Sequence, residues 1–416
     1  MNAYAIIILA TLFFGFFLDI ITNLYNLRAL RSELPEEFSD VYDAEKYSRS
    51  QEYTRVRTRF GFLTGTMGLV ITLIFWFSGG FNFLDQFIRS WHLHIIWTGL
   101  IYIGIILLAR FIFGLPFSVY STFVIEEKFG FNKTTPSVFI TDILKGMLLA
   151  ILLGGPLLAG LLYFFNTFGD TAWLYCWAAT VLFTLFVQFI APTWIMPLFN
   201  KFTPLEDGEL RSAIESYTDK VHYPLRGLYV MDGSKRSAKS NAFFTGFGKN
   251  KRIALFDTLV NKHTVPELVA VLAHEIGHYK KKHIIKGMII SIVHMGVLFY
   301  LLSIFLSHKG LFDAFYMEQM GVYTGLIFFG MLYAPVEMIL SILMQIFSRK
   351  NEYEADQFAL ETTGDAPSFI SALKKLSADN LSNLTPHPLY VFLNYSHPPV
   401  LQRIRRLGKE NLVVKG

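Results

Sequence analysis

The sequence is poor in cysteine and in charge. Its 416 residues include one cysteine, Cys176, so no intrachain disulfide can form and a disulfide-stabilised scaffold is excluded. Charged residues make up only 17% of the chain, against about 25% in a typical soluble domain. Because 53% of the residues are hydrophobic and the mean hydropathy is +0.41, intrinsic disorder and an ordinary soluble enzyme are excluded as well. The formal charge of +5 is modest, and we expect no nucleic-acid partner.

Seven apolar stretches are each long enough to cross about 30 Å of hydrocarbon as a helix. We expect them to span a lipid bilayer, which predicts a mainly α, multi-pass membrane protein. The first stretch lacks a basic leader and a cleavage site, which favours a span over a signal peptide. Pro192 and Pro197 predict an abrupt end to the fifth. The stretches are approximately Tyr4–Ile21, Phe62–Phe83, Ile95–Phe113, Leu144–Phe165, Trp173–Ile190, Ile284–Leu306 and Val322–Phe347.

Basic residues predict the orientation of these spans. The odd-numbered connections and the C-terminal tail carry most of them, whereas the even-numbered connections offer little beyond Arg89 and Lys309. Since Lys and Arg favour the cytoplasmic side, we expect the C-terminus in the cytoplasm and the N-terminus outside. The basic residues of the first connection are Arg28, Arg31, Lys46, Arg49, Arg55, Arg57 and Arg59.

A polar insert separates the fifth span from the sixth. Three of its segments are rich in Val, Ile, Tyr and Phe and predict the strands of a small sheet. Thr264 and Glu267 then have the spacing of a capping box, and Pro266 suits a first helical turn. We expect this helix to run through His278 and across the following lysines into the sixth span. The predicted strands are Gly227–Met231, Asn241–Phe247 and Arg252–Phe256.

The segment His274-Glu275-Ile276-Gly277-His278 indicates metal chemistry. Residues four apart lie on one face of a helix, so the two imidazoles converge on a single point. Zinc accepts such a pair, adds a third protein ligand and leaves its fourth position for water. Glu275 projects toward that water and can take its proton. The alternative is a pair of helix-face histidines without a metal.

A third ligand is available after the seventh span. Glu352 and Asp356 are also four apart on a predicted helix. Glu352 can complete a His, His, Glu site, and Asp356 can accept the outer N–H of a ligating histidine. Taken alone, an acidic start to a helix that also includes Glu354 is the commoner explanation. When the acidic pair is considered together with the two histidines, metal ligation is the better explanation.

Several segments together resemble the type I CAAX prenyl proteases, which are multi-span zinc metalloendopeptidases of the gluzincin group. The likeness covers essentially the whole chain. It departs mildly from the usual Ser-Arg-Arg-Phe-Glu pattern, because Lys350 and Asn351 precede Glu352, but neither position is expected to ligate metal. The segments are His274–His278, Ser348–Asp356, Ser396–Pro399, Tyr53–Gly61 and Ser240–Arg252.

The resemblance implies an α-barrel, a ring of seven tilted helices around a large water-filled chamber, with one zinc ion facing the interior. It implies removal of the C-terminal tripeptide from CAAX-type proteins, prenylated ones among them, and a role in the quality control of membrane proteins. The chain is shorter than typical eukaryotic members and ends without a lysine-rich retrieval signal. We therefore favour a bacterial inner membrane, with the endoplasmic reticulum membrane as the alternative. We expect a monomer.

The resemblance also assigns roles outside the metal ligands. Asn241, Ala242 and Phe243 would lie on a strand edge that pairs with the peptide substrate, although an ordinary hairpin explains the pattern equally well. His397 and Arg403 would stabilise the oxyanion, against the plain alternative of a capped surface loop. Two further histidines show no ligand spacing, and we expect an interfacial His283 and a chamber-lining His294.

The predicted organisation has four parts: spans one to five in residues 1–199, a peptidase segment in 200–283, spans six and seven in 284–347, and a C-terminal peptidase segment in 348–416. Two rivals to a zinc endopeptidase remain. A seven-span transporter or receptor with a regulatory metal would have no need of Glu275. A site-two-type protease would place the histidine motif within a span and use a Leu-Asp-Gly element, which the sequence lacks.

Overall fold

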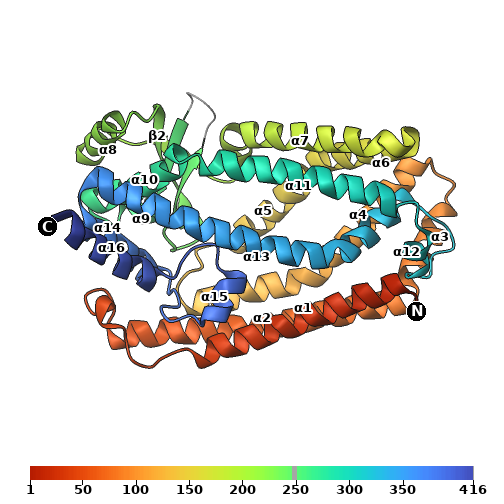
Figure 1. Ribbon diagram of the computed structural model, residues 1–416, viewed down its shortest axis with the longest axis horizontal. Helices are drawn as coiled ribbons and strands as arrows, with labels where there is room; N and C mark the ends of the chain where they lie inside the picture. The colour runs from red at the N-terminus through yellow and green to blue at the C-terminus, as the bar shows by residue number, and fades with distance from the viewer. Residues whose placement is uncertain (246–250, 416) are drawn as a thin grey trace.

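The structure is a computed structural model that describes residues 1–245 and 251–415. Helices form most of it, and a small sheet lies near one end of the long axis (Figure 1). The helices are α1 (Ala3–Arg28), α2 (Ala44–Phe77), α3 (Gly80–Arg89), α4 (Ile95–Tyr120), α5 (Pro136–Leu149), α6 (Gly155–Thr167), α7 (Ala172–Ile190), α8 (Glu209–Lys220), α9 (Asp257–Val260), α10 (Val265–Lys280), α11 (His283–Phe305), α12 (Lys309–Asp313), α13 (Val322–Thr363), α14 (Ala366–Asp379), α15 (Pro388–Asn394) and α16 (Val400–Lys415).

Seven helical segments are long and apolar enough to cross a membrane, and the predicted seven spans are confirmed. Several extend well past the predicted ends, because a helix can continue into water once its apolar part has crossed the bilayer. The second begins at Ala44, so most basic residues of the first connection lie on a helix. The segments are Ala3–Arg28, Ala44–Phe77, Ile95–Glu126, Pro136–Thr167, Gly169–Leu198, His283–Phe305 and Val322–Thr363.

The α-helix of the fifth span ends at Ile190, before Pro192 as predicted, but the span itself does not end there. The fifth span continues from α7 through a π-helix, Ala191–Ile195, and a 3-10 turn, Met196–Leu198. Wider and tighter turns of this kind re-arrange the backbone hydrogen bonds, so that a proline lacking its N–H is accommodated. Two other spans also contain π-helices, Ser121–Glu126 after α4 and Ala150–Gly154 between α5 and α6.

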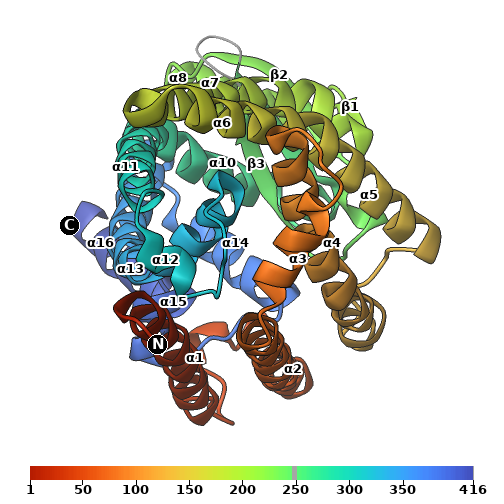
Figure 2. The same ribbon diagram turned by 90° about the vertical axis from the view of Figure 1, so that its right-hand side faces the viewer.

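Viewed along the long axis, the spans follow one another around a ring (Figure 2). Helix α7 packs against α11, and α13 packs against both α11 and α1. At the end that holds the N-terminus, an aromatic core ties the ring together. Phe315 stacks on Phe328 with ring centroids 3.9 Å apart, and the buried Trp76 donates a hydrogen bond to the Ala314 carbonyl.

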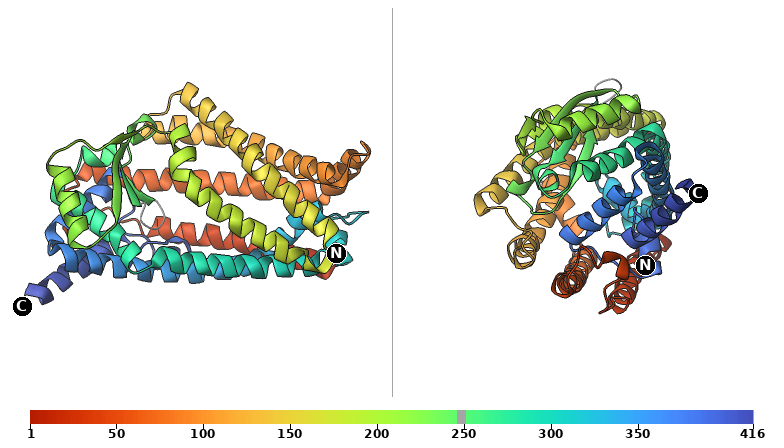
Figure 3. Two further views of the ribbon diagram at one scale, coloured as in Figure 1. Left: turned by 90° about the horizontal axis from the view of Figure 1, so that it is seen from above. Right: turned by 90° about the vertical axis from the view of Figure 1, so that its left-hand side faces the viewer.

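The sheet has the strand order β1-β2-β4-β3 and lies near the opposite end of the molecule (Figure 3). Strand β2 pairs in parallel with β4, and β1 and β3 are antiparallel to their neighbours. The three predicted strands are present, although residues 246 and 247 of the second lie outside the described residues. The prediction missed β1. The strands are β1 (Phe202–Pro204), β2 (Leu225–Met231), β3 (Ala242–Thr245) and β4 (Lys251–Phe256).

The helix expected to run from Thr264 into the sixth span is two helices. Helix α10 ends at Lys280, Lys282 adopts a left-handed backbone with φ of 59°, and α11 begins at His283. Such a residue interrupts the ladder of helical hydrogen bonds, so the prediction of one continuous helix is wrong. The seventh span has no such break. Helix α13 continues from its membrane segment through Asp356 as one helix.

Candidate metal centre

Helix α10 presents two imidazoles to one point. The capping box predicted at Thr264 and Glu267 is present and starts the helix. The apolar face of α10 packs into a hydrophobic core that it shares with the sheet and α14. His274 and His278 then lie one turn apart, with their Nε2 atoms separated by 3.3 Å. His274 is buried, while the side chain of His278 keeps 19% of its surface exposed.

Helix α13 brings a carboxylate to the same point. Glu352 Oε1 lies 3.2 Å from His278 Nε2, and Glu352 Oε2 lies 3.4 Å from His274 Nε2. One ligand atom from each of the three residues falls within 4.8 Å of the others. The close packing of α10 on α13 produces this arrangement, because the two helices contribute side chains from facing surfaces.

The donor set fits a metal ion. Glu352 is buried, yet its Oε2 atom accepts no hydrogen bond from any residue that the structure describes, and a cation would satisfy it. Two imidazoles and one carboxylate are the ligands of open zinc sites. Burial lowers the pKa of His274, but its contacts with the Asp356 and Glu352 carboxylates outweigh burial and raise this pKa to about 9. A cation that binds here therefore displaces a proton.

Asp356 and Arg403 form a buried pair behind His274. Asp356 Oδ1 lies 2.8 Å from His274 Nδ1, which leaves the His274 Nε2 atom directed at the metal position. The Arg403 guanidinium binds the Asp356 carboxylate through two nitrogens, at 2.5 and 2.9 Å. Arg403 Nη1 also lies 3.7 Å from Glu352 Oε2. Arg403 thus contacts a candidate ligand and the group that orients another.

Two predicted catalytic residues flank the three ligands. Glu275 is half-buried and makes no hydrogen bond or ion pair with any residue in the described part of the chain. His397 lies in the loop before α16, with Nε2 3.3 Å from Glu352 Oε1 and 63% of its side chain exposed. Ser396 Oγ lies 2.9 Å from the other ring nitrogen, Nδ1. The His397 side chain can therefore reach a molecule bound at the metal position.

Strand β3 is the outermost strand of the sheet at its end of the strand order. Asn241 precedes it and is exposed, and its side-chain Oδ1 accepts a hydrogen bond from the Ala242 N–H at 2.8 Å. Ala242 and Phe243 pair with Leu255 and Ala254 on β4. The other side of β3 is a sheet edge, which offers backbone groups to an extended peptide.

The segment before β3 is fixed to the membrane helices. Lys239 Nζ lies 2.8 Å from both Tyr53 Oη and Glu126 Oε2, while Arg57 donates a hydrogen bond to Tyr53 at 2.9 Å. The Lys239 ammonium also lies 4.3 Å from the centroid of the Phe131 ring. This cluster joins the second and third spans to the residues that lead into the sheet edge.

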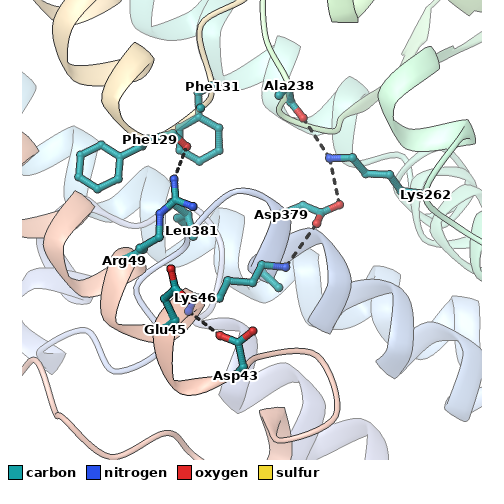
Figure 4. Close-up of a pocket in the computed structure, with 12 residues that line it drawn as sticks. Asp43, Glu45, Lys46, Arg49, Phe129, Phe131, Ala238, Lys262, Asp379 and Leu381 are labelled. Carbon is teal, nitrogen blue, oxygen red and sulfur yellow. Dashed lines mark hydrogen bonds and ion pairs between the residues drawn. The ribbon is translucent and has the colours of Figure 1, made fainter.

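A pocket of 400 Å³ lies beside that segment (Figure 4). Across it, Lys262 donates a hydrogen bond to the Ala238 carbonyl and lies 3.3 Å from Asp379 Oδ2. Lys46 approaches the other oxygen of Asp379 at 3.8 Å. None of the candidate site residues lines this pocket. The contacts of Asp379 with Lys46 and Lys262 join α14 to α2 and to the segment after α9.

Sequence reasoning missed the environment of His283. This side chain is buried, with Nδ1 3.1 Å from His278 Nδ1 and Nε2 3.1 Å from Glu354 Oε2. The expected interfacial position stays a prediction, since His283 is the first residue of the sixth span. His294 lies on α11 3.2 Å from both Tyr333 Oη and Glu337 Oε1.

Comparisons with known proteins agree with this geometry. Residues 23–201 match the family described as "CAAX prenyl protease N-terminal, five membrane helices", and residues 204–411 match peptidase family M48. CAAX prenyl protease 1 of Saccharomyces cerevisiae is 36% identical, over 90% of this chain and 88% of the yeast protein. The Homo sapiens homologue is 34% identical, over 90% and 89%. The crystal structure of S. mikatae Ste24p superposes with a TM-score of 0.90 at 35% identity, covering 98% of this chain and 99% of that one.

A ring of spans that carries a peptidase fold of this kind makes the protein an integral-membrane metallopeptidase, which acts on peptide or protein substrates at a lipid bilayer. The chain belongs to peptidase family M48 and carries the five-helix amino-terminal segment of the CAAX prenyl proteases. The transporter or receptor and the site-two-type protease are not favoured. Helix α10 lies outside all seven spans, whereas a site-two-type protease requires the histidine motif within one.

Proposed function

We propose that the chain is a zinc endopeptidase that removes the C-terminal tripeptide of CAAX-type proteins, prenylated ones included. The convergence of His274, His278 and Glu352 supports the proposal. Glu275 follows His274 on α10 and makes no hydrogen bond or ion pair with any residue that the structure describes. The substrate class is supported by relatives that are named CAAX prenyl protease 1 and align along nearly their whole length.

His274, His278 and Glu352 hold one zinc ion, and Asp356 fixes the His274 tautomer. When bound there, zinc supplies a Lewis acid that polarises the scissile carbonyl and lowers the pKa of a water molecule toward about 7. Side chains of the protein carry out the proton transfers. The free carboxylate of Glu275 takes a proton from the attacking water and passes it to the leaving amine.

His397 and Arg403 stabilise the negative charge that develops on the carbonyl oxygen. His397 is the direct donor, because its side chain is 63% exposed while Nε2 lies 3.3 Å from Glu352. Arg403 is buried and committed to Asp356, so it contributes positive charge from behind the ligands. Removing either side chain is expected to lower kcat more than it weakens substrate binding.

The substrate adds a strand to β3. Asn241 holds the peptide through its exposed side chain, while Ala242 and Phe243 offer main-chain groups along the edge. An extended peptide needs no fixed side-chain sequence to pair in this way. The pairing therefore positions the scissile bond, and other parts of the molecule select the substrate.

The chain works as a monomer, because all three ligands come from one polypeptide. We place its N-terminus outside and its C-terminus in the cytoplasm, since the basic residues of α2 lie at the same end of the molecule as the peptidase segment. The relatives compared above come from eukaryotes, which supports the endoplasmic reticulum membrane over a bacterial inner membrane.

Two fluorescent peptides of one sequence, one farnesylated and one not, test the proposal. Detergent-purified protein is incubated with each, with and without a chelator, and the products are identified by mass spectrometry. We expect release of the C-terminal tripeptide, loss of release after chelation, and recovery when zinc is added back. Cleavage that survives complete metal removal would contradict the metalloprotease mechanism. Equal rates on the two peptides would remove the prenyl-specific part of the proposal.

A further inference from the structure

The break between α10 and α11 places a third histidine behind the metal position. Lys281 and Lys282 donate their backbone N–H groups back to the Gly277 and Tyr279 carbonyls, which ends α10. Lys282 then takes up its left-handed conformation, which is unfavourable for a non-glycine residue. His283 follows His278 by five positions, a spacing that does not put two side chains on one face of a continuous helix. The break brings these side chains together.

The contacts of His283 form a chain of three groups. Its Nδ1 lies 3.1 Å from His278 Nδ1, and its Nε2 lies 3.1 Å from Glu354 Oε2. The two imidazole rings are 5.1 Å apart between centroids and inclined at 73°, so they meet through their nitrogens and do not stack. His283 is 5% exposed, and the Glu354 side chain is 35% exposed.

The direction of each hydrogen bond follows from the donors and acceptors present. The ionised Glu354 carboxylate can only accept, so His283 Nε2 carries the proton. A neutral His283 then has its lone pair on Nδ1 and accepts from His278 Nδ1–H. The proton on Nδ1 leaves the lone pair of His278 on Nε2, the atom that faces Glu352 and His274.

The two histidine ligands are therefore oriented by different means. His274 donates directly to the Asp356 carboxylate, whereas no carboxylate contacts His278 Nδ1 among the described residues. We propose that His283 is a positioning residue of the metal site, which holds the tautomer and ring orientation of His278 and relays to it the charge of Glu354. The inference rests on the proposed function, because it takes His278 as a ligand.

Metal affinity should therefore depend on His283, although His283 does not contact the metal. Removing a group that orients a ligating histidine weakens metal binding by about 10–100-fold. His283→Leu removes the acceptor for His278 Nδ1–H, so we expect a loss in this range. His283→Asn keeps a carbonyl oxygen that can accept the same hydrogen bond, and we expect it to recover part of the affinity. Glu354→Leu leaves His283 free to change tautomer, and we expect a smaller loss.

Zinc affinity is measured on the full-length protein in detergent, by competition with a chromophoric chelator at fixed pH. His294→Leu is the matched control, because it removes an imidazole from the same helix whose partners are Tyr333 and Glu337. Its affinity should equal that of the parent. The apparent Tm of the metal-free proteins is recorded alongside, because a purely structural role would lower this Tm and leave the affinity unchanged.

Wild-type affinity in folded His283→Leu would overturn the inference, and so would equal losses in the Leu and Asn variants. If His283→Leu fails to fold, the comparison of Glu354→Leu with the parent serves instead, and unchanged affinity there would overturn the inference too. Failure of the proposed function looks different, since the parent protein itself would then bind no stoichiometric zinc.

Discussion

Gly277 lies so close to Ala355 that a methyl group on its Cα would sit 3.1 Å from both the Cα and the carbonyl oxygen of Ala355. Gly277 stands between the two proposed histidine ligands on α10, and Ala355 follows Glu352 by three residues on α13. Both residues are buried. The missing side chain at Gly277 therefore allows the two helices to approach until the Glu352 carboxylate reaches both imidazoles.

Gly277→Ala should weaken metal binding. The added methyl group forces α10 and α13 apart, and overpacking of this kind costs about 1–3 kcal/mol. The separation moves Glu352 away from His274 and His278, so we expect zinc affinity to fall about tenfold or more in a chelator competition. Gly287→Ala is the control, because nothing lies within 4 Å of a methyl group there. If Gly277→Ala binds zinc with the parental affinity, the close approach of α10 and α13 is not required for metal binding.

Glu275→Gln separates metal binding from proton transfer. The variant keeps the shape of the side chain and all three ligands, so we expect stoichiometric zinc by elemental analysis. It can no longer take a proton from water, and general-base catalysis is worth about 10²–10⁴-fold. We expect the rate of tripeptide release to fall by at least that factor. A variant that cleaves like the parent would contradict the role of Glu275.

The parts of the site that the sequence could predict depend on local spacing. His274, Glu275 and His278 form a helical repeat, and Glu352 with Asp356 forms another, so their relative directions follow from helix geometry alone. The seven spans were likewise readable from apolar runs. These features need no knowledge of how distant segments meet.

The missed parts depend on backbone breaks and long-range packing. The contact of His283 with His278 requires the left-handed Lys282, and nothing in a run of lysines indicates such a break. The contact of Lys239 with Glu126 joins residues separated by 113 positions. Strand β1 has three residues and ends in a proline, so it lacks the apolar run that identifies a strand.

Glu267→Gln tests how α10 is anchored. Glu267 is buried and contacts Lys375 at 2.7 Å, Ser371, and the backbone N–H of Thr264 at 2.9 Å. Burial raises the pKa of Glu267, but these hydrogen bonds outweigh it and the pKa is lowered. A lowered pKa stabilises the fold above the unfolded value of about 4.3, and this contribution is lost as pH falls through the folded value.

The variant can keep the cap to Thr264 but loses the ion pair with Lys375, so it should have a lower apparent Tm than the parent at pH 7, by an amount that corresponds to about 1 kcal/mol. The difference should shrink as the pH falls below about 4.3. Glu215→Gln on α8 is the control, because Glu215 pairs with Arg211 at an exposed position and such pairs contribute little. A gap in Tm that widens toward low pH would contradict this explanation.

Lys239→Met should loosen the substrate edge without touching the metal. The variant loses the contacts with Tyr53 and Glu126 that fix the residues leading into β3, so the edge becomes less ordered before the peptide binds. Ordering it then costs binding energy, which raises KM. We expect KM for a CAAX peptide to rise several-fold while zinc affinity stays at the parental value. Lys235→Met removes an exposed lysine from the same segment and should leave KM unchanged. A fall in kcat alone, with KM unchanged, would show that the cluster acts on the reaction and not on the position of the strand.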